Sequence, residues 1–455
     1  MKHPDNINEP LTGAEITGMT FAGSTLTMLN VVISLFITYF YTNIVGISAA
    51  IIGTLMLVTR VAEGFSDLSM GVIINRTQSR WGQARPWSLR LSIPLLIIVI
   101  LTFHIPENWD MTAKTIYACI TYFFLFTVTL APAGIIGTVL GTNMTSNAKS
   151  RQKNAVISTL FVLIGSVAGN YIVMHLTGSM GDSHYTWRLI AIIFGLLSFT
   201  GQLMQFLLTR ERFTNPVKDT HESVKTSIRK QLPTLIRNKY FLIMCAVGMM
   251  TALDGATMGI MLFYFRYIIN NIDLMGVFSL VSLIPMVAGI GLTQLLSKRI
   301  PAKQLIIGGL IIKSITLMIN FCFPANLPLF IGFTVLRSLT RTPLLVFSSV
   351  YLLNTIEYGE YKTGTRAGSM IVSISGLWNK VGAGIGGALV GWLLSYGGYD
   401  SDASVQSILA QNIIVVISFL IPLITTVVIL ILLSMYDLDK QYDSIIESLR
   451  ERKGI

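Results

Sequence analysis

The chain has 455 residues, of which 52% are hydrophobic and 12% charged, with a mean hydropathy of +0.66 and a formal net charge of +11. Soluble globular domains carry about 25% charged residues, so this composition excludes a soluble protein. Its apolar runs also exclude a β-barrel, whose strands alternate apolar and polar residues over about ten positions. The sequence therefore predicts an all-α polytopic membrane protein.

Twelve apolar runs are each long enough to cross a bilayer as a helix. In chain order they cover residues 18–41, 48–74, 88–105, 115–138, 155–178, 187–208, 241–269, 273–296, 304–323, 327–350, 367–396 and 406–434. Six lie in an N-terminal half, 1–208, and six in a C-terminal half, 241–434. A polar connector, 209–240, separates the halves, and a short tail, 435–455, is expected to be amphipathic or disordered. Two six-helix halves with such a connector are typical of the major facilitator fold, in which substrate binds between the halves near the midplane.

The positive charge is confined to alternate polar segments. Of the 33 Lys and Arg residues, 23 lie in the segments that share a side with the N-terminus, and the six segments on the other side hold none. Basic loops stay in the cytoplasm, so we expect both termini to be cytoplasmic and the protein to be a multi-pass protein of a bacterial inner membrane. The basic surplus therefore indicates topology in the lipid bilayer, and we expect no nucleic-acid partner.

The second span contains the charged stretch RVAEGFSD. Arg60, Glu63 and Asp67 are three and four residues apart, so they share one helical face. Each charge at a helix centre costs about 2.5–3.5 kcal/mol, which is tolerable if this face looks into a polar cavity or at partners. Two carboxylates one turn apart either bind a cation or share a proton, and Ser66 adds a neutral oxygen. The alternative is an Arg60–Glu63 salt bridge that only stabilises packing, which leaves Asp67 unexplained.

Intramembrane charges also occur in the C-terminal half. Lys380 lies near the middle of its span, beside Trp378 and Asn379, so it is poorly placed to reach an interface. An indole and an amide next to an ammonium suit a polyhydroxylated ligand. Asp254, in the seventh span, is a further candidate for substrate binding. The sequence indicates no role for the other cations in these spans, which are Lys313, Arg337 and Arg341.

The other sequence patterns indicate no catalytic, metal-binding or nucleotide-binding site. The run GAGIGG, residues 382–387, has dinucleotide-binding spacing but lies in a predicted membrane helix, where small residues let helices pack closely. The sequence contains neither a nucleophile triad, a metal-ligand cluster nor an ATP-binding loop. We therefore expect no enzymatic activity, no cofactor, no ATP and no metal beyond Na⁺ at the span-2 carboxylates. Transport would then use an H⁺ or Na⁺ gradient or run downhill.

Three stretches are characteristic of a known family: YTNIVGISAAIIGTLMLVTRVAEGFSD (41–67), NRTQSRWGQARPW (75–87), and NTIEYGEYKTGTR followed by LWNKVGAGIGG (354–387). Through them the chain resembles the glycoside–pentoside–hexuronide:cation symporters, typified by the melibiose and glucuronide carriers. The resemblance implies the major facilitator fold, and cation-coupled symport of a glycoside or related sugar by alternating access.

The resemblance also implies a set of cation ligands. Glu63 and Asp67 fall on the two cation-site acids of the family's second helix, and Glu63 stands where most members have Asp. Ser66 falls where the sodium-using melibiose carrier has Asn. Thr127 and Thr129 correspond to contributors from the fourth helix. The coupling ion implied by these positions is H⁺ or Na⁺.

On the substrate side the resemblance is weaker. Arg60 and Lys380 match a family arginine of helix 2 and a family lysine of helix 11. Thr27 takes the place of an acid on helix 1 that binds sugar hydroxyls in the melibiose carrier, and Asn30 lies nearby. The acid of helix 4 and the arginine of helix 5 that complete that site are absent here. A substrate of different shape, or an anionic or aglycone-bearing one, is therefore expected. The alternative is a transporter of the same fold for a lipid, a lysolipid or another non-sugar solute.

Overall fold

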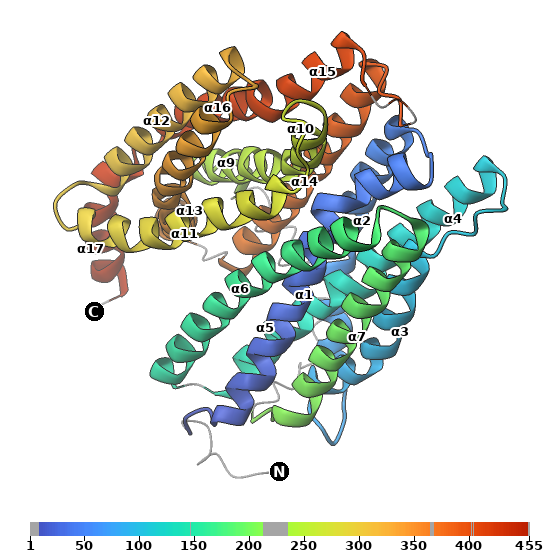
Figure 1. The fold of residues 1–455 in the computed structure, drawn as a ribbon. Helices are drawn as coiled ribbons and strands as arrows, with labels where there is room; N and C mark the ends of the chain where they lie inside the picture. Colours follow the sequence, from blue (N-terminus) through green and yellow to red (C-terminus); the bar gives the residue numbers. More distant parts are fainter. Residues whose placement is uncertain are drawn as a thin grey trace. The chain divides into compact units, whose positions relative to one another are not determined.

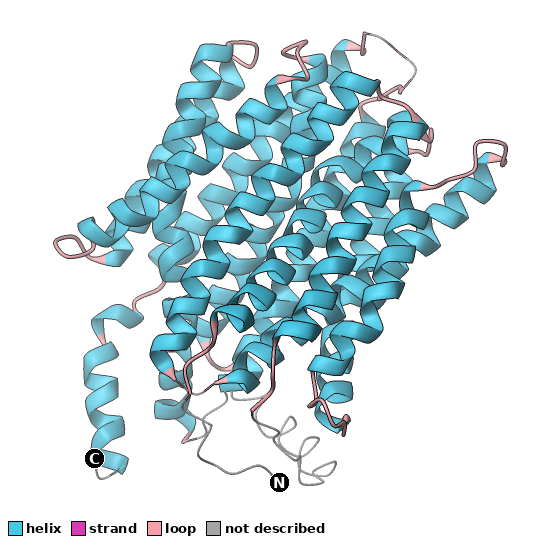
Figure 2. Ribbon diagram, turned by 60° about the horizontal axis from the view of Figure 1, so that its bottom comes forward, coloured by secondary structure: helices cyan, strands magenta, loops and turns pink. Residues whose placement is uncertain are grey.

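The computed structural model describes residues 9–145, 147–212, 235–364, 368–401, 403 and 405–453. These residues form helices and no strand, which confirms the predicted all-α class (Figure 2). Apolar sequence favours this outcome, because a helix satisfies its own backbone N–H and C=O groups where water is absent. Within the described ranges, eleven helices are long and apolar enough to cross a membrane.

The chain divides into two compact units. Unit 1 comprises Met1–Lys218, Asp273–Ser279 and Asp400–Ser404, and unit 2 comprises Asp219–Ile272, Leu280–Tyr399 and Val405–Ile455. The bounds predicted for the two halves and for the tail stay predictions. The predicted connector, 209–240, falls largely on residues 213–234, which lie outside the described part of the chain.

The first helices of the chain, coloured blue to green in Figure 1, belong to unit 1. They are α1 (Gly13–Tyr39), η2 (Phe40–Ile44), α2 (Ala49–Arg76), α3 (Arg85–Phe103), α4 (Met111–Phe124), η3 (Leu125–Leu130), α5 (Ala131–Met144), α6 (Ala148–Met180) and α7 (His184–Leu208). The segments η2 and η3 are π-helical and continue their neighbours without a break. Single membrane spans therefore run over Gly13–Ile44 and over Met111–Met144.

The later helices follow the connector (Figure 1). They are α9 (Lys239–Ala256), η4 (Thr257–Ile260), α10 (Met261–Tyr267), α11 (Leu274–Leu296), α12 (Ala302–Cys322), α13 (Leu327–Thr363), α14 (Gly368–Tyr396), α15 (Ile408–Val415), η5 (Val416–Leu420), α16 (Ile421–Ser434), η6 (Leu438–Lys440) and α17 (Tyr442–Lys453). Helix α14 occupies the span predicted at 367–396 but is not among the eleven apolar helices. Its Asn379, Lys380 and glycines lower its hydropathy.

Polar side chains determine where several helices begin. Thr12 and Glu15 form a capping box at α1: the Glu15 carboxylate accepts the Thr12 N–H at 2.9 Å, and the Thr12 hydroxyl accepts the Glu15 N–H at 3.3 Å. Asp110 accepts two backbone N–H groups at the start of α4, and Asn326 accepts one at the start of α13. These residues stand in polar segments next to apolar runs, so each helix start coincides with a signal visible in the sequence.

Glycines bring helices α9 and α14 of unit 2 into backbone contact. A Cβ on Gly382 would meet the backbone of Met249, and one on Gly386 would meet the carbonyl oxygen of Leu253 at 2.5 Å. Residues with side chains could not occupy these positions without separating the two helices. The GAGIGG run is therefore a packing surface, as the sequence predicts.

The C-terminal tail ends in helix α17, which packs on α13. Ile445 and Leu449, one turn apart, are buried in a cluster that includes Tyr351 and Leu438. The Tyr351 hydroxyl donates to the Asp439 carboxylate at 3.1 Å. The tail was expected to be amphipathic or disordered. Because α17 buries one apolar face, its described part is an amphipathic helix.

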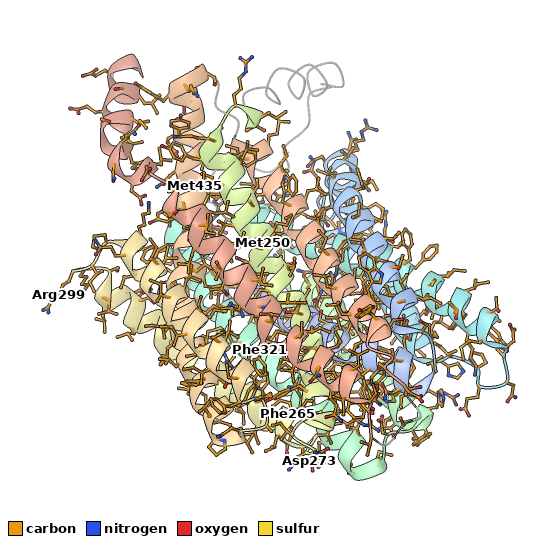
Figure 3. All side chains as sticks on the ribbon, turned by 90° about the horizontal axis from the view of Figure 1, so that it is seen from above. Met250, Phe265, Asp273, Arg299, Phe321 and Met435 are labelled. Carbon is orange, nitrogen blue, oxygen red and sulfur yellow. The ribbon has the colours of Figure 1, made fainter. Side chains whose placement is uncertain are left out.

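The basic residues at the junction of α11 and α12 lie in two different surroundings. Lys298 and Arg299 are exposed, and the Arg299 side chain extends away from the helices (Figure 3). Lys303 instead donates to the Tyr436 carbonyl at 2.6 Å and lies 3.5 Å from the Asp437 carboxylate. This lysine ties the start of α12 to the segment that follows α16.

The loop at 75–87 is held by a carboxylate from the segment after α7. Glu211 accepts hydrogen bonds from three successive backbone N–H groups, those of Gln83, Ala84 and Arg85, at 3.0, 2.8 and 2.6 Å. These groups are at the N-terminus of α3, where the helix dipole favours a negative charge. Gly82 makes the approach feasible, because its φ is +108° and a Cβ there would lie 2.5 Å from the Glu211 carboxyl carbon.

Gly82→Ala is expected to lower the free energy of unfolding by about 1–3 kcal/mol, because Ala is strained at positive φ and its methyl group displaces Glu211. Thermal unfolding of the detergent-solubilised protein measures the change. Gly71→Ala is the matched control, since a Cβ at Gly71 of α2 meets nothing within 4 Å. Equal melting temperatures for both variants would contradict the prediction.

Candidate functional site

The charged face of α2 is the first part of the site. The helix is continuous from Ala49 to Arg76, so Arg60, Glu63 and Asp67 share one face, as predicted. The Arg60 guanidinium donates to the Glu63 carboxylate at 2.9 Å. Glu63 is buried, and Arg60 and Asp67 are half-buried. The salt bridge that was the alternative to a cation site is therefore present, and it involves two of the three charges.

The π-helical segment η3 packs against α2. The Ser66 hydroxyl donates to the Thr127 carbonyl oxygen, so two predicted cation ligands from separate helices are brought together. The hydroxyls of Thr127 and Thr129 donate to carbonyls of their own helix, each at 2.6 Å. A hydroxyl that donates in this way still offers lone pairs to a cation. Single π-helical turns are frequent at functional sites, because they expose backbone groups that an α-helix would pair.

Phe126 of η3 supports the Arg60 side chain. The Arg60 guanidinium carbon lies 4.2 Å from the Phe126 ring centroid, within cation–π range. Phe126 packs on Tyr122, with ring centroids 4.8 Å apart, and Tyr122 lies 6.4 Å from Tyr41. All three rings are buried. The Arg60–Glu63 pair is thus backed by an aromatic wall, which the aromatic run TYFFLF at 121–126 could have indicated and which sequence reasoning missed.

The candidate residues of α1 are hydrogen-bonded along their own helix. The Thr27 hydroxyl donates to the Gly23 carbonyl at 2.8 Å, and the Asn30 side-chain oxygen accepts from Ser34 at 3.3 Å. Both candidate side chains are half-buried. These hydrogen bonds use the Thr27 hydroxyl proton and the Asn30 side-chain oxygen, and they orient both side chains along α1.

Helix α14 carries the substrate candidates of unit 2. Trp378 is 41% exposed, Asn379 is exposed, and Lys380 is half-buried. The Asn379 side chain packs against Gly248 of α9, where a Cβ would collide with it. The glycine therefore lets an amide reach across from α14 to the surface of α9.

A cavity of about 440 Å³ lies between α9, α13 and α14 of unit 2. Its apolar walls include Met244, Val247 and Leu344. Its polar lining consists of Thr251, Arg341, Ser348, Ser349, Ser375 and Asn379. A concave, largely apolar site with a few polar groups is the usual form of a small-molecule site. Of the substrate candidates named from the sequence, Asn379 lines this cavity.

Asp254 forms an ion pair inside unit 2. Its carboxylate lies 2.9 Å from the Lys313 ammonium of α12, and both residues are buried. Sequence reasoning named Asp254 and left Lys313 without a role, because spacing between separate helices carries no signal about contact. Arg337 and Arg341 are four residues apart on α13, a spacing that could have marked one charged helical face.

No group of three or more His, Cys, Asp or Glu side chains within the described ranges is arranged to hold a metal ion. The oxygen-rich region of α2 and η3, with two carboxylates, a serine and two threonines, has the chemistry of a site for a hard monovalent cation or a proton.

Buried charges in long apolar helices, together with a concave cavity inside unit 2, are typical of a membrane transporter. Solved transporters share its fold. A point mutant of the peptide transporter POT superposes with a TM-score of 0.66 at 12% identity, covering 97% of this chain and 98% of that one. A point mutant of the nucleoside transporter NupG gives a TM-score of 0.64 at 12% identity, covering 93% and 99%.

A family model described as MFS/sugar transport protein matches residues 18–440, and the chain belongs to that family. YagG of Escherichia coli, a candidate glycoside/cation symporter, is 31% identical over 92% of this chain and 90% of its own. The isoprimeverose transporter of Lactiplantibacillus pentosus is 27% identical, over 92% and 88%. The glucuronide carrier protein homolog of Escherichia coli is 26% identical, over 99% and 98%.

Proposed function

We propose that this transporter couples uptake of a glycoside or related sugar to a monovalent cation by alternating access. The charged face of α2 is the observation that carries the proposal. Arg60, Glu63 and Asp67 have a summed charge of −1, so one H⁺ or Na⁺ would neutralise the face. Removing that charge from a membrane-spanning helix lowers the cost of moving the face away from water, which links ion binding to conformational change.

Glu63, Asp67, Ser66, Thr127 and Thr129 would hold the ion. The Ser66–Thr127 hydrogen bond supports this grouping, because it keeps η3 against the acids of α2. If the ion is Na⁺, several of these oxygens coordinate it together. If it is H⁺, one carboxylate suffices. Coupling to Na⁺ would therefore require the neutral oxygens of Ser66, Thr127 and Thr129, whereas coupling to H⁺ would not.

The sugar would be bound by Lys380, Trp378 and Asn379, with Arg60 at the α2 face and Asp254 acting through its lysine partner. Thr27 and Asn30 would add hydroxyl and amide contacts from α1. Relatives named for glycosides, isoprimeverose and glucuronide support a sugar as cargo, and the lipid alternative finds no support among them. The alternation of basic loops supports cytoplasmic termini, and the bacterial relatives support a bacterial inner membrane as the location.

Uptake into right-side-out vesicles tests the proposal. Vesicles containing the protein are given a panel of labelled glycosides under a Na⁺ gradient, a pH gradient or neither. We expect accumulation of at least one glycoside under one gradient and equilibration only without it. Vesicles without the protein are the control. Failure to move any glycoside, even by counterflow, would refute the proposal.

A further inference from the structure

Arg341 places a positive charge in the cavity of unit 2. It lies about 21 Å along α13 from the helix start, at 1.5 Å per residue, and so near the middle of a membrane-spanning helix. Pro343 follows two residues later and cannot pair with the carbonyl of Leu339. The Thr342 hydroxyl donates to that carbonyl at 2.7 Å instead. The Thr342 hydroxyl thus satisfies a backbone carbonyl of α13 that Pro343 leaves unpaired, next to Arg341.

Arg341 is charged, and the other residues that line this cavity are neutral. Asp254 is already paired with Lys313 at 2.9 Å. Across the described residues, no carboxylate lies within 4.0 Å of the Arg341 guanidinium. The cavity lining therefore has an unbalanced positive charge on a membrane-spanning helix.

Arg337 differs from Arg341 in what its side chain does. Its guanidinium donates to the Thr334 hydroxyl at 2.9 Å and lies 5.6 Å from the Phe330 ring centroid. Arg337 is not among the residues that line the cavity. It serves the internal packing of its own helix, so the cavity's cationic group is Arg341.

An intramembrane guanidinium costs about 2.5–3.5 kcal/mol and is retained where it has a partner or a function. Its planar fork matches carboxylate and sulfonate oxygens in paired hydrogen bonds. Around it, Thr251, Ser348 and Asn379 offer hydroxyl and amide groups suited to sugar hydroxyls. We propose that this cavity binds an anionic group, a carboxylate or sulfonate, of the transported sugar, and that Arg341 is the residue that binds it. This inference rests on the proposed sugar transport and specifies its substrate.

Matched pairs of substrates test the inference in vesicles containing the full-length protein. Each pair differs only at C6: methyl glucoside against methyl glucuronide, and methyl galactoside against methyl galacturonide. The 6-sulfonate analogue of the glucoside distinguishes sulfonate from carboxylate. The measurement is half-saturation for uptake or for competition with a transported glycoside. We expect the acidic member of at least one pair to bind tenfold or more tightly than its neutral partner.

Variants then assign that preference to Arg341. Arg341→Gln should lose the tenfold preference while half-saturation for the neutral member changes less than threefold. Arg341→Lys keeps the charge but not the fork, so it should retain part of the preference. Arg337→Gln removes a nearby cation that does not line the cavity, and it should keep the preference.

Two results would overturn the inference. One is equal or tighter binding of the neutral member in every pair. The other is an Arg341→Gln variant that weakens both members equally, since equal loss would mean a role in the transport cycle or in folding. Cation-driven uptake of neutral glycosides without acid preference would refute the anion site and leave the proposed function intact. If neither the members of these pairs nor any other glycoside of the uptake panel is moved, both the inference and the proposed function are refuted.

Discussion

Asp67→Asn is expected to abolish cation-driven accumulation of sugar while sugar counterflow continues. A neutral amide replaces a carboxylate whose charge-assisted interaction with a cation is worth about 1.5–3 kcal/mol, so cation affinity should fall by about ten- to a hundredfold. Glu63→Gln should have a similar effect and should also release Arg60, which now donates to that carboxylate at 2.9 Å. Vesicle uptake with and without an ion gradient, alongside counterflow, separates loss of coupling from loss of folding.

Glu107→Gln is the matched control for these variants. Glu107 pairs with Arg188 at 3.1 Å, but its side chain is 55% exposed, and exposed ion pairs contribute about 0–1 kcal/mol. We expect normal accumulation from this variant. If Glu63→Gln and Asp67→Asn both accumulated sugar as well as Glu107→Gln does, α2 would not contain the coupling site, and the Arg60–Glu63 pair would be a packing interaction.

Asp254→Asn is expected to destabilise unit 2 by about 3–5 kcal/mol, because it leaves the buried Lys313 ammonium without its counter-charge. Lys313→Met removes the charge instead and leaves a buried carboxylate, with a loss of similar size. The double variant Asp254→Asn/Lys313→Met removes both charges and should recover most of the stability. Thermal unfolding of the solubilised protein, analysed as a double-mutant cycle, measures the coupling between the two residues.

Additive losses in this cycle would contradict a buried ion pair that matters energetically. Uptake assays on the double variant add a second readout. If Asp254 also contributes to substrate binding, the double variant will be stable but will show weaker half-saturation for the sugar. If the pair only stabilises unit 2, half-saturation will stay at the wild-type value.

Much of the helical architecture could be predicted because the signals are local. Apolar runs about 20 residues long mark membrane helices whatever their neighbours do. Thr12, Asp110 and Asn326 mark helix starts through contacts within a few residues. The shared face of Arg60, Glu63 and Asp67 follows from helical spacing alone. The π-helical turn at Leu125–Leu130 was not predictable, since it preserves helical composition and alters only the hydrogen-bond register.

The candidate site was predicted in part, because only some of its signals are local in the sequence. The acids of α2 lie on one helix, so their relation is contained in a short stretch of sequence. Phe126 was missed because its role depends on Arg60 of another helix. Arg341 was left without a role because its depth in the membrane was not apparent from the sequence. Its cavity draws on three helices, and its lack of a nearby carboxylate among the described residues appears only in three dimensions.

Composition and short-range periodicity act within single helices, so the amino-acid sequence was sufficient to predict the membrane class, the helical composition and the intramembrane charges of α2. Which groups meet depends on the tertiary structure. Ser66 reaches the Thr127 carbonyl across 61 positions, and Asp254 reaches Lys313 across 59. Such pairings depend on how each helix is rotated and how closely glycines let it approach its neighbour. That information is distributed over all the packed side chains and is absent from any one stretch of the chain.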